Sequence, residues 1–369
     1  MSAATIRQCV ILAGGLGTRL GAITAGAPKP VLDVSGRPFL FWLMREMQRF
    51  GVEEFLVLSG YLSAQLEQAV RAAAASLPRP ASIAFSVEPT PAGTGGALFQ
   101  ARGMLDERFL LCNGDSLFDC NLARLLSAAW TDGAETLGRM LLRQAGEASR
   151  YGVVSLQGDR VTAFHERPAT GVSGLINAGV YALNRRILEH LSPSCSLERD
   201  VFPVLAAAGQ LRGTPAEGWF IDIGVPEDLQ RARVALASRL RRPALFLDRD
   251  GVLNRDHGYV GTRERWEWMP GALAALRLAA DQGWHVFVVT NQAGVARGFY
   301  DEEAVRMLHT WMANEARCAG GTVDDLRYCP FHPQAPLAAY RRVSDCRKPG
   351  AGMLLDLIRV WDLDPGRCL

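Results

Sequence analysis

A glycine-rich segment with one arginine follows the first apolar run of the chain. Residues 9–13 are apolar, and residues 13–20 read A-G-G-L-G-T-R-L, with Arg19 near the end. Glycine lets backbone N–H groups approach phosphate oxygens without an intervening Cβ, and a guanidinium supplies fixed positive charge. Lys29 follows, between two prolines. The pattern predicts a phosphate-binding loop; the alternative is a tight strand–helix turn and a surface lysine.

A second set of chemically capable residues follows later apolar runs. Asp248 and Asp250 could share one Mg²⁺ at a strand end, while one acts as a nucleophile and the other as an acid. Residues 290–292 read T-N-Q, and residues 346–349 read C-R-K-P. A hydroxyl, two amides and two cations in this order predict a site for a phosphoryl group. Structural acids, and a surface ion pair for Arg347, are the alternatives.

The first segments resemble the signature of sugar nucleotidyltransferases, G-G-x-G-T-R-L followed by P-K-P. The resemblance covers about residues 7–235 and continues in the family's order. The further matching segments are Glu88, T-G-G-A at 94–97, N-G-D at 113–115, Y-G-V at 151–153, F-H-E-R-P at 164–168, N-A-G at 177–179 and W-F-I-D-I-G at 219–224.

This resemblance implies a role for each matched residue. Asp115 and Asp222 would hold Mg²⁺, Arg19 the triphosphate and the leaving pyrophosphate, and Lys29 would neutralise the phosphates at the reacting centre. Helix capping is the alternative for Asp115, and a structural carboxylate for Asp222. The implied nucleotide-binding residues are Leu12, Ala13, Gly14, Gly15, Gly17, Thr18, Arg19, Glu88, Gly95 and Asp115. The implied sugar-binding residues are Gly152, Glu166, Arg167 and Asn177, with Arg167 where the family usually has lysine.

The motifs D-x-D-G-x-x-N, T-N-Q and R-K-P resemble the haloacid dehalogenase superfamily, in its heptose bisphosphate and histidinol phosphatase branch. That resemblance implies that Asp248 attacks phosphorus and that Asp250 protonates the leaving oxygen and then activates water; both would hold Mg²⁺. The remaining implied roles belong to Thr290 and Lys348, which hold the phosphoryl group, and to Asn291 and Arg347, which orient the substrate.

The second resemblance is incomplete in two places. Members of the branch carry a zinc held by C-x-H and C-x-C, whereas here Phe331 and Ser344 replace two ligands. Cys329, His332 and Cys346 remain as candidate zinc ligands, and we favour two core thiols over zinc. The family's later acidic G-D-x-x-D element does not follow Lys348. Residues 368–369 look like the start of its strand, so we expect a truncated chain or an impaired phosphatase.

The elements that position these residues alternate between short apolar runs and longer amphipathic stretches. Residues 54–59 and 108–112 are typical of buried strands, and residues 39–50 and 62–75 of helices, which favours an α/β fold with a mainly parallel sheet. A helix at 226–240 would close the first unit. We expect a Rossmann-like, GT-A-like nucleotidyltransferase domain at 1–238. A haloacid dehalogenase-type Rossmannoid domain at 243–369, lacking its C-terminal part, would follow.

The composition narrows the class of protein. The 369 residues are 49% hydrophobic and 21% charged, which is typical of a folded domain rather than a disordered one. A net charge of +2 without a basic run does not favour nucleic-acid binding. No window approaches the roughly 18 apolar residues of a membrane helix. Eight scattered cysteines are expected as reduced thiols in a cytoplasmic protein.

The presence of both sites on one chain suggests a substrate. A phosphatase that removes a remote phosphate from a sugar bisphosphate leaves a sugar 1-phosphate for the transferase. The first half is most similar to heptose-1-phosphate guanylyltransferases, which implies GTP as the NTP and heptose phosphates as the sugars. A transferase for another sugar (mannose, glucose or N-acetylmuramic acid 1-phosphate) and a transferase with an inactive second domain stay open. The sequence carries no signal for an oligomeric state.

Overall fold

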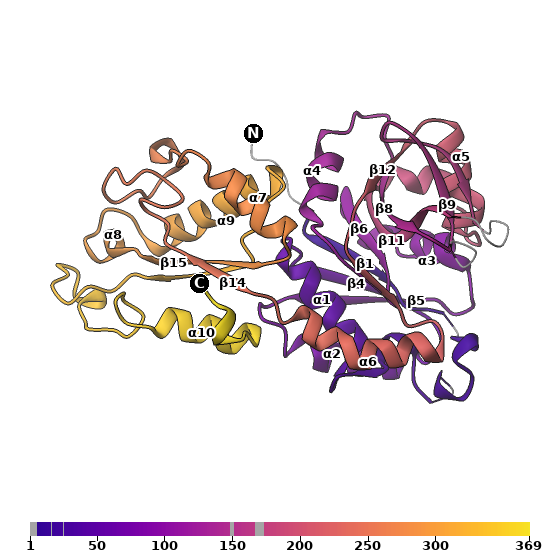
Figure 1. Cartoon of the computed structure of the whole chain (residues 1–369), viewed down its shortest axis with the longest axis horizontal. Coiled ribbons are helices and arrows are strands. Elements are labelled where there is room, and N and C mark those ends of the chain that lie inside the picture. Colours follow the sequence, from indigo (N-terminus) through magenta and orange to yellow (C-terminus); the bar gives the residue numbers. More distant parts are fainter. Residues whose placement is uncertain (1–5, 16, 25, 148–150, 167–172) are drawn as a thin grey trace. The chain divides into compact units, whose positions relative to one another are not determined.

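The structure is a computed structural model that describes residues 6–15, 17–24, 26–147, 151–166 and 173–369. The chain divides into two compact units, Ile6–Ser238 and Arg239–Leu369 (Figure 1). The predicted domain boundary near residue 240 lies beside this division. Each unit consists of a sheet with helices packed against it, and each is described separately below.

The first unit is built on a nine-stranded mixed sheet in the order β5-β4-β1-β6-β11-β8-β12-β10-β9. Its parallel half comprises β5 (Ser82–Val87), β4 (Glu54–Ser59), β1 (Gln8–Leu12) and β6 (Arg108–Asn113). The other half comprises β11 (Gly174–Asn184), β8 (Gly138–Ala145), β12 (Leu211–Pro215), β10 (Arg160–His165) and β9 (Val153–Gln157). Two short pairings flank the sheet: β2 (Asp33–Val34) with β3 (Arg37–Pro38), and β7 (Ser116–Asp119) with β13 (Trp219–Asp222).

The strand β1 shows why this half of the sheet is parallel and buried. Cys9, Val10 and Ile11 are fully buried, so both faces of the strand are covered. A continuous apolar run is typical of strands in such sheets. β1 pairs in parallel with both β4 and β6, and the ends of the three strands therefore meet at one edge. This is the edge where open α/β sheets bind ligands.

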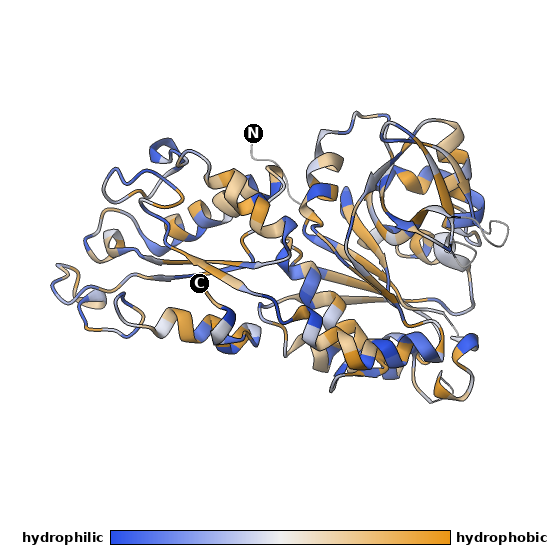
Figure 2. Cartoon of the chain, in the orientation of Figure 1, coloured by the Kyte–Doolittle hydropathy of each residue, from blue (hydrophilic) through white to orange (hydrophobic). Residues whose placement is uncertain are grey.

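The helices of the first unit are α1 (Phe39–Arg49), α2 (Ser63–Ala74), α3 (Gly93–Gln100), α4 (Ala123–Thr131), α5 (Phe202–Ala207) and α6 (Pro226–Leu240). Three of them, α1, α2 and α6, match the helices predicted at 39–50, 62–75 and 226–240. Shorter turns are η1 (Thr18–Thr24), η2 (Lys29–Val31), η3 (Arg102–Met104), η4 (Arg185–His190) and the π-helical η5 (Leu197–Val201). α1 packs against α2, and α4 packs on β8, β11 and β12. Figure 2 shows strands dominated by hydrophobic residues and helices with hydrophilic outer positions.

The second unit has a three-stranded parallel sheet in the order β14 (Ala244–Leu247), β15 (His285–Asn291) and β16 (Asp325–Cys329). Cys368 forms a parallel bridge to Ala244, and the Leu369 N–H donates to the Ala244 carbonyl at 2.9 Å. The expectation that residues 368–369 adopt strand pairing is confirmed. The helices are α7 (Ala272–Asp281), α8 (Ala293–Ala296), α9 (Glu302–Cys318) and α10 (Gly352–Trp361), with the turns η6 (Arg263–Arg265), η7 (Ala338–Tyr340) and η8 (Pro365–Arg367).

The alternation of side chains along β15 explains the two layers of helices. Val286 and Val288 belong to one core cluster, which includes Leu308 and Met312 of α9. Phe287 and Val289 belong to another, which includes Leu357 and Trp361 of α10. Successive strand residues point to opposite faces of a sheet, so one apolar strand supports both layers. In Figure 1, α7 and α9 lie on one side of β14 and β15, and α10 lies on the other.

Across the described part of the chain, no helix combines the length and apolar character needed to span a membrane.

Candidate functional site

A cavity of about 460 Å³ opens at the carboxyl ends of β1 and β6 in the first unit. Side chains and backbone from the loop after β1, from η2 and from the start of α3 enclose it. The lining residues are Leu12, Ala13, Gly14, Gly15, Gly17, Arg19, Lys29, Pro30, Leu58, Glu88, Pro91, Gly93, Thr94, Ala97, Asn113, Asp115, Glu198 and Gly224. Most of the residues predicted to bind nucleotide are therefore brought to one cavity.

Lys29 lies between two aspartates at this cavity. Its Nζ forms an ion pair with Oδ2 of Asp115 and lies 3.7 Å from Oδ1 of Asp222. The side chain of Lys29 is only 9% exposed, so its charge is largely shielded from water. Two partly buried carboxylates around one ammonium stabilise it, since an isolated buried charge is costly.

The short pairing of β7 with β13 explains how these aspartates meet. Asp222 stands opposite Ser116 in that pairing, and Ser116 directly follows Asp115 in the chain. The Ile223 N–H also donates to the Asp115 carbonyl at 2.9 Å, and the Gly224 N–H to Oδ1 of Asp222 at 2.7 Å. A backbone ladder thus brings together two carboxylates that are far apart in the sequence.

The carboxylate oxygens of Asp115 and Asp222 are of the ligand type that a magnesium ion prefers. Both converge on one cation position, and hard divalent cations prefer oxygen ligands. Within the described ranges, no group of three or more His, Cys, Asp or Glu side chains could hold a metal. Mg²⁺ is commonly bound by one or two carboxylates together with substrate phosphates and water, which matches a site with two protein ligands.

The glycine loop owes its residue types to close packing. A Cβ on Gly14 would overlap Oε1 of Glu88, and a Cβ on Gly60 would lie 3.0 Å from the same oxygen. Gly17 adopts a φ of 63°, a left-handed conformation that favours glycine. Arg19 is exposed at the cavity. The side chain of Thr18, predicted to bind nucleotide, lies outside the described part of the structure.

The start of α3 packs against residues 193–196, which come from a distant part of the chain. The N–H groups of Gly95 and Gly96 both donate to the Cys195 carbonyl, at 2.9 and 3.0 Å. A Cβ on Gly95 would lie 2.6 Å from the Cys195 sulfur. Gly95 was predicted to bind nucleotide, but the cavity is lined by its neighbours Gly93 and Thr94 instead. Close packing against Cys195 requires glycine at this position, and a contact of Gly95 with the nucleotide stays a prediction.

Glu198 is a cavity residue that the sequence did not single out. Its Oε2 accepts hydrogen bonds from the hydroxyls of Thr94, at 2.6 Å, and Ser196, at 3.0 Å. The Thr94 hydroxyl in turn accepts from the Leu197 N–H at 2.9 Å. The sequence carries no signal for Glu198, because the contacts of its segment S-L-E-R-D with the T-G-G turn are visible only in three dimensions.

Two of the residues predicted to bind sugar, Gly152 and Asn177, are in contact, although the cavity-lining set does not include them. The Asn177 N–H donates to the Gly152 carbonyl at 2.9 Å, and its Nδ2 donates to the Tyr181 hydroxyl at 2.6 Å. Burial, and then the charge of Glu198, raises the pKa of Tyr181 well above its usual value, so this hydroxyl stays neutral. Glu166 is exposed after β10, and Arg167 lies outside the described residues.

A second cluster forms at the carboxyl ends of the strands in the second unit. Lys348 Nζ lies 2.5 Å from Oδ2 of Asp248 and donates to the Val289 carbonyl at 3.0 Å. Asn291 exchanges hydrogen bonds with the Lys348 backbone: its Oδ1 accepts from the N–H at 3.0 Å, and its Nδ2 donates to the carbonyl at 3.2 Å. Asp248, Asn291 and Lys348 are thereby brought together from three separate segments.

Asp250 is held by a network of N–H donors. Its Oδ1 accepts from Asn254 at 3.0 Å, its Oδ2 accepts from Gln292 at 2.9 Å, and the buried Arg249 guanidinium bonds both oxygens. Gln292 also donates to the Thr290 hydroxyl at 3.0 Å, and Thr290 is buried. These donors hold the Asp250 carboxylate in place, and its role as a magnesium ligand stays a prediction.

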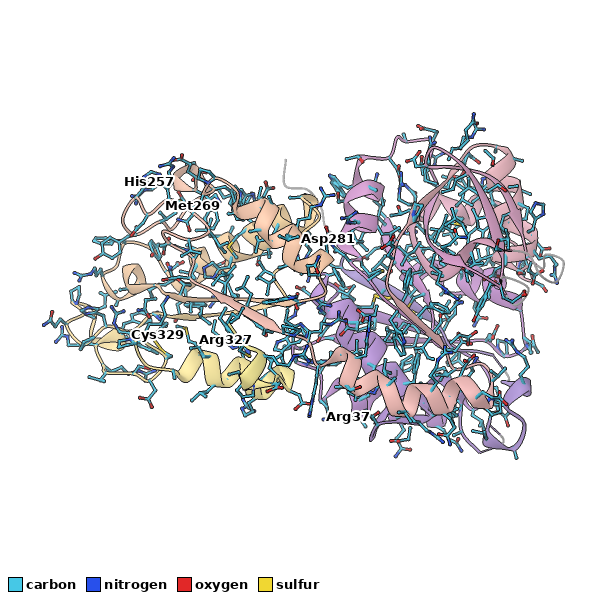
Figure 3. All side chains as sticks on the ribbon, in the orientation of Figure 1. Arg37, His257, Met269, Asp281, Arg327 and Cys329 are labelled. Carbon is cyan, nitrogen blue, oxygen red and sulfur yellow. A yellow bond between two sulfur atoms is a disulfide. The ribbon has the colours of Figure 1, made fainter. Side chains whose placement is uncertain are left out.

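The zinc ligands considered from the sequence do not form a metal site. Cys329 and Cys346 are joined in a disulfide, with Cα atoms 5.6 Å apart, and Nδ1 of His332 accepts from the Gln334 N–H at 3.1 Å. The expectation of two reduced core thiols is therefore wrong for this pair. Cys329 ends β16 and Cys346 lies in the loop before α10, so the fold brings them within bonding range. Figure 3 labels Cys329 together with Arg327, whose Nε donates to Asp356 of α10 at 2.7 Å.

Comparisons with known proteins find similarity to nucleotidyltransferases and to a sugar-bisphosphate phosphatase. A family model described as nucleotidyl transferase matches residues 8–239. Over 232 residues the chain is 32% identical to the D-glycero-alpha-D-manno-heptose 1-phosphate guanylyltransferase of Aneurinibacillus thermoaerophilus, covering 62% of this chain and 98% of that protein. Over 131 residues it is 53% identical to the D-glycero-beta-D-manno-heptose-1,7-bisphosphate 7-phosphatase of Rhodopseudomonas palustris, covering 36% and 73% respectively.

A solved structure agrees in fold. HddC from Yersinia pseudotuberculosis is similar with a TM-score of 0.54 and 29% identity, covering 62% of this chain and 98% of that one. A second structure of that protein, in complex with GMP-PN, has the same TM-score and coverage.

Proposed function

Because the chain belongs to the nucleotidyl transferase family, we propose that its first unit transfers GMP from GTP to D-glycero-α-D-manno-heptose 1-phosphate. The position of Lys29 between Asp115 and Asp222 at the cavity carries this proposal. The similarity to a heptose 1-phosphate guanylyltransferase and to a protein crystallised with GMP-PN supports the choice of sugar and base.

The proposed reaction joins two anions, so charge neutralisation is the main task of the protein. An oxygen of the sugar 1-phosphate attacks the α-phosphorus of GTP, the α–β bridging bond breaks, and pyrophosphate leaves. Lys29 neutralises the reacting phosphates from a shielded position, and Arg19 holds the triphosphate at the cavity. Asp115 and Asp222 would hold Mg²⁺, which supplies further positive charge to the phosphates when bound.

We propose a second activity for the second unit, in a haloacid dehalogenase-type fold: removal of the 7-phosphate from heptose 1,7-bisphosphate. A carboxylate oxygen of Asp248 attacks phosphorus, the bond from phosphorus to the C7 oxygen breaks, and an aspartyl-phosphate forms. Asp250 protonates the departing sugar oxygen and then takes a proton from the water that hydrolyses the intermediate. Lys348, at 2.5 Å from Asp248, neutralises the phosphoryl group.

The similarity to a heptose 1,7-bisphosphate 7-phosphatase over 131 residues supports this assignment. The product of the second unit would then be the substrate of the first. A second candidate is a transferase whose second unit is inactive. The N–H donors that occupy both oxygens of Asp250 favour that candidate.

The test is to supply purified chain and Mg²⁺ with each of the four NTPs separately and, in parallel reactions, with heptose 1,7-bisphosphate, heptose 1-phosphate, mannose 1-phosphate or glucose 1-phosphate. Products would be followed by ³¹P NMR. Phosphate release, followed by pyrophosphate and GDP-heptose with GTP alone, supports both activities. Transfer to heptose 1-phosphate without phosphate release from the bisphosphate supports the inactive second unit. Equal transfer to mannose or glucose 1-phosphate contradicts the assigned sugar.

A further inference from the structure

Three aromatic rings and one arginine form a cluster beside the β7–β13 pairing of the first unit. Phe118 and Phe220 stand opposite each other in that pairing, and their rings pack edge to face with centres 6.0 Å apart. Tyr151 also packs edge to face on Phe220, at 5.8 Å. The guanidinium carbon of Arg143, from β8, lies 4.4 Å from the centre of the Phe220 ring and 5.6 Å from that of Tyr151. Arg143 therefore contacts two rings from different segments, and Arg143, Tyr151 and Phe220 are called the arginine clamp below.

The rings, rather than carboxylates, are the main partners of the Arg143 side chain. Among the residues that the structure describes, no carboxylate forms an ion pair with it, and its buried Nε has no hydrogen-bond partner. Burial lowers the pKa of Arg143, while Tyr151 acts in the opposite direction. A guanidinium that is shielded from water gains more from an aromatic face than an exposed one does. The stack on Phe220 is therefore a specific contact that holds two segments together.

Phe220 connects the clamp to the two aspartates of the cavity. It lies two residues before Asp222 on β13, and the pairing of β13 with β7 brings Asp222 beside Asp115. Both carboxylates lie around Nζ of Lys29. Because a two-stranded ribbon has little stability of its own, packing must fix where it lies on the larger sheet. A displacement of Phe220 would therefore move the carboxylate pair relative to the other cavity residues.

Tyr151 and Arg143 connect the clamp to the segments predicted to bind sugar. Tyr151 directly precedes Gly152, whose carbonyl accepts from the Asn177 N–H at 2.9 Å. Arg143 stands opposite Ile176 in the pairing of β8 with β11, and Ile176 directly precedes Asn177. Directly opposed residues point to the same face of a sheet, and neighbours along a strand point to opposite faces. Arg143 therefore supports these segments from the face opposite to the Asn177 side chain.

We propose that Arg143 is a positioning residue of the nucleotidyl transferase: its contacts with Phe220 and Tyr151 hold the Asp115–Asp222 pair at a fixed place relative to the predicted sugar-binding segments. The inference rests on the proposed transfer reaction, in which the sugar phosphate must lie in line with the α-phosphorus. A misplacement of about 1 Å can cost about a hundredfold in rate. Lysine cannot replace Arg143 fully, because it keeps the charge but lacks the flat guanidinium face.

Amide hydrogen exchange tests the clamp without any substrate. The variant Arg143→Met removes the guanidinium and keeps a long apolar side chain. The control is Arg108→Met, since the Arg108 guanidinium carbon lies 5.1 Å from the centre of the Trp130 ring at the start of β6, whose other end carries Asn113 of the cavity. We expect exchange in β13 and in residues 151–154 to become about fivefold faster in Arg143→Met alone. Unchanged exchange in these segments, or an equal rise throughout the first unit, would overturn the clamp.

Steady-state kinetics with GTP and heptose 1-phosphate tests whether the clamp acts on the reaction. Arg143→Met should lower kcat about tenfold and raise KM for the sugar 1-phosphate about fivefold, with KM for GTP unchanged. Arg143→Lys should recover part of the rate, and the control should match the wild-type protein. A fall in the urea midpoint without any change in kcat or KM would limit Arg143 to a structural role and contradict the proposal.

The coupling between Arg143 and Phe220 gives a further check. If the two residues act through one contact, Arg143→Met combined with Phe220→Leu should be no slower than the slower single variant. Additive losses would mean that the two residues act separately, against the proposal. If the wild-type protein transfers GMP to none of the sugar 1-phosphates, the proposed function fails, and hydrogen exchange alone decides the clamp.

Discussion

A Cβ atom on Gly14 would overlap Oε1 of Glu88, so the glycine loop and this carboxylate are fitted to each other. The other oxygen of Glu88 accepts a hydrogen bond from the Ala92 N–H at 3.1 Å, which fixes the carboxylate before α3. Both residues line the cavity. The loop therefore cannot accept a larger residue at Gly14 without moving Glu88.

The variant Gly14→Ala should raise KM for the nucleotide about tenfold, because the added methyl group displaces the Glu88 carboxylate, which lines the cavity. Gly103→Ala is the control, since a Cβ there meets no atom within 4 Å. Steady-state transfer assays with GTP would measure both. An unchanged KM in Gly14→Ala would show that Glu88 can move without cost.

Lys29→Met should lower kcat for nucleotidyl transfer by about 10²- to 10³-fold, the range seen when one preorganised charge or donor is lost. Asp115 and Asp222 would also lose the ammonium that lies between them. Lys29→Arg keeps the charge but not the reach, and it should recover only part of the rate. Phosphate release by the second unit serves as the internal control; a parallel loss there would indicate general unfolding.

The parallel strands and the residues that directly follow them were predictable from the sequence. The runs predicted as strands at 54–59 and 108–112 form β4 and β6 within one residue of expectation, because short apolar runs between polar segments leave few alternatives. The convergence of Asp115 and Asp222 required the family resemblance. The pairing of β7 with β13 that brings them together has no local sequence signal.

Other features depended on contacts between distant segments. Glu198 reaches the cavity through a π-helical turn and two hydroxyl partners, and neither follows from hydrophobic periodicity. Cys329 and Cys346 were expected as separate thiols because three candidate ligands are too few for a closed zinc site and scattered cysteines are typical of reduced thiols. Their proximity follows from where β16 ends and where the chain returns before α10. The close packing of Gly95 against Cys195 likewise has no local sequence signal.

Glu198→Gln should raise KM for the sugar 1-phosphate more than KM for GTP. Glu198 is close enough to raise the pKa of Tyr181, whose hydroxyl binds Asn177, so it faces the predicted sugar side of the unit. Removing its charge weakens hydrogen bonds from sugar hydroxyls by about 1 kcal/mol, or roughly fivefold in KM. Asp200→Asn, at the exposed Arg199–Asp200 pair, is the matched control. A larger change in KM for GTP would assign Glu198 to the nucleotide instead.

Tyr300→Phe should reduce phosphate release while leaving nucleotidyl transfer intact. The Tyr300 hydroxyl donates to Oε1 of Gln292 at 2.8 Å, and Gln292 donates to Asp250, so the tyrosine orients the amide that holds the acid. Burial raises the pKa of Tyr300 to about 12, which keeps the hydroxyl a donor at neutral pH. The loss of one such bond costs about 1 kcal/mol. The phosphatase kcat and the urea midpoint would be measured together. A lower midpoint with an unchanged kcat would limit Tyr300 to a structural role.

His309→Gln should make the second unit less sensitive to acid. His309 is buried, and its Nε2 lies 3.1 Å from Nη1 of Arg249, where it can only accept. Burial, and then the charge of Arg249, lowers the pKa of His309 well below its usual value of 6.5. The folded state therefore keeps the imidazole neutral while the unfolded chain takes up a proton below pH 6.5. Its contribution to stability is present above that pH and is lost as the pH falls towards the folded-state pKa.

The corresponding slope is at most about 1.4 kcal/mol per pH unit, and glutamine removes it while its amide oxygen still accepts from Arg249. Urea unfolding of the wild-type protein and of His309→Gln between pH 7 and pH 4.5 would measure it, with His257→Gln at the exposed His257–Glu267 pair as the control. The free energy of unfolding of His309→Gln should decline less steeply with acid than that of either other protein. If the free energies of unfolding of all three proteins fall equally with decreasing pH, protonation of His309 does not contribute to acid unfolding.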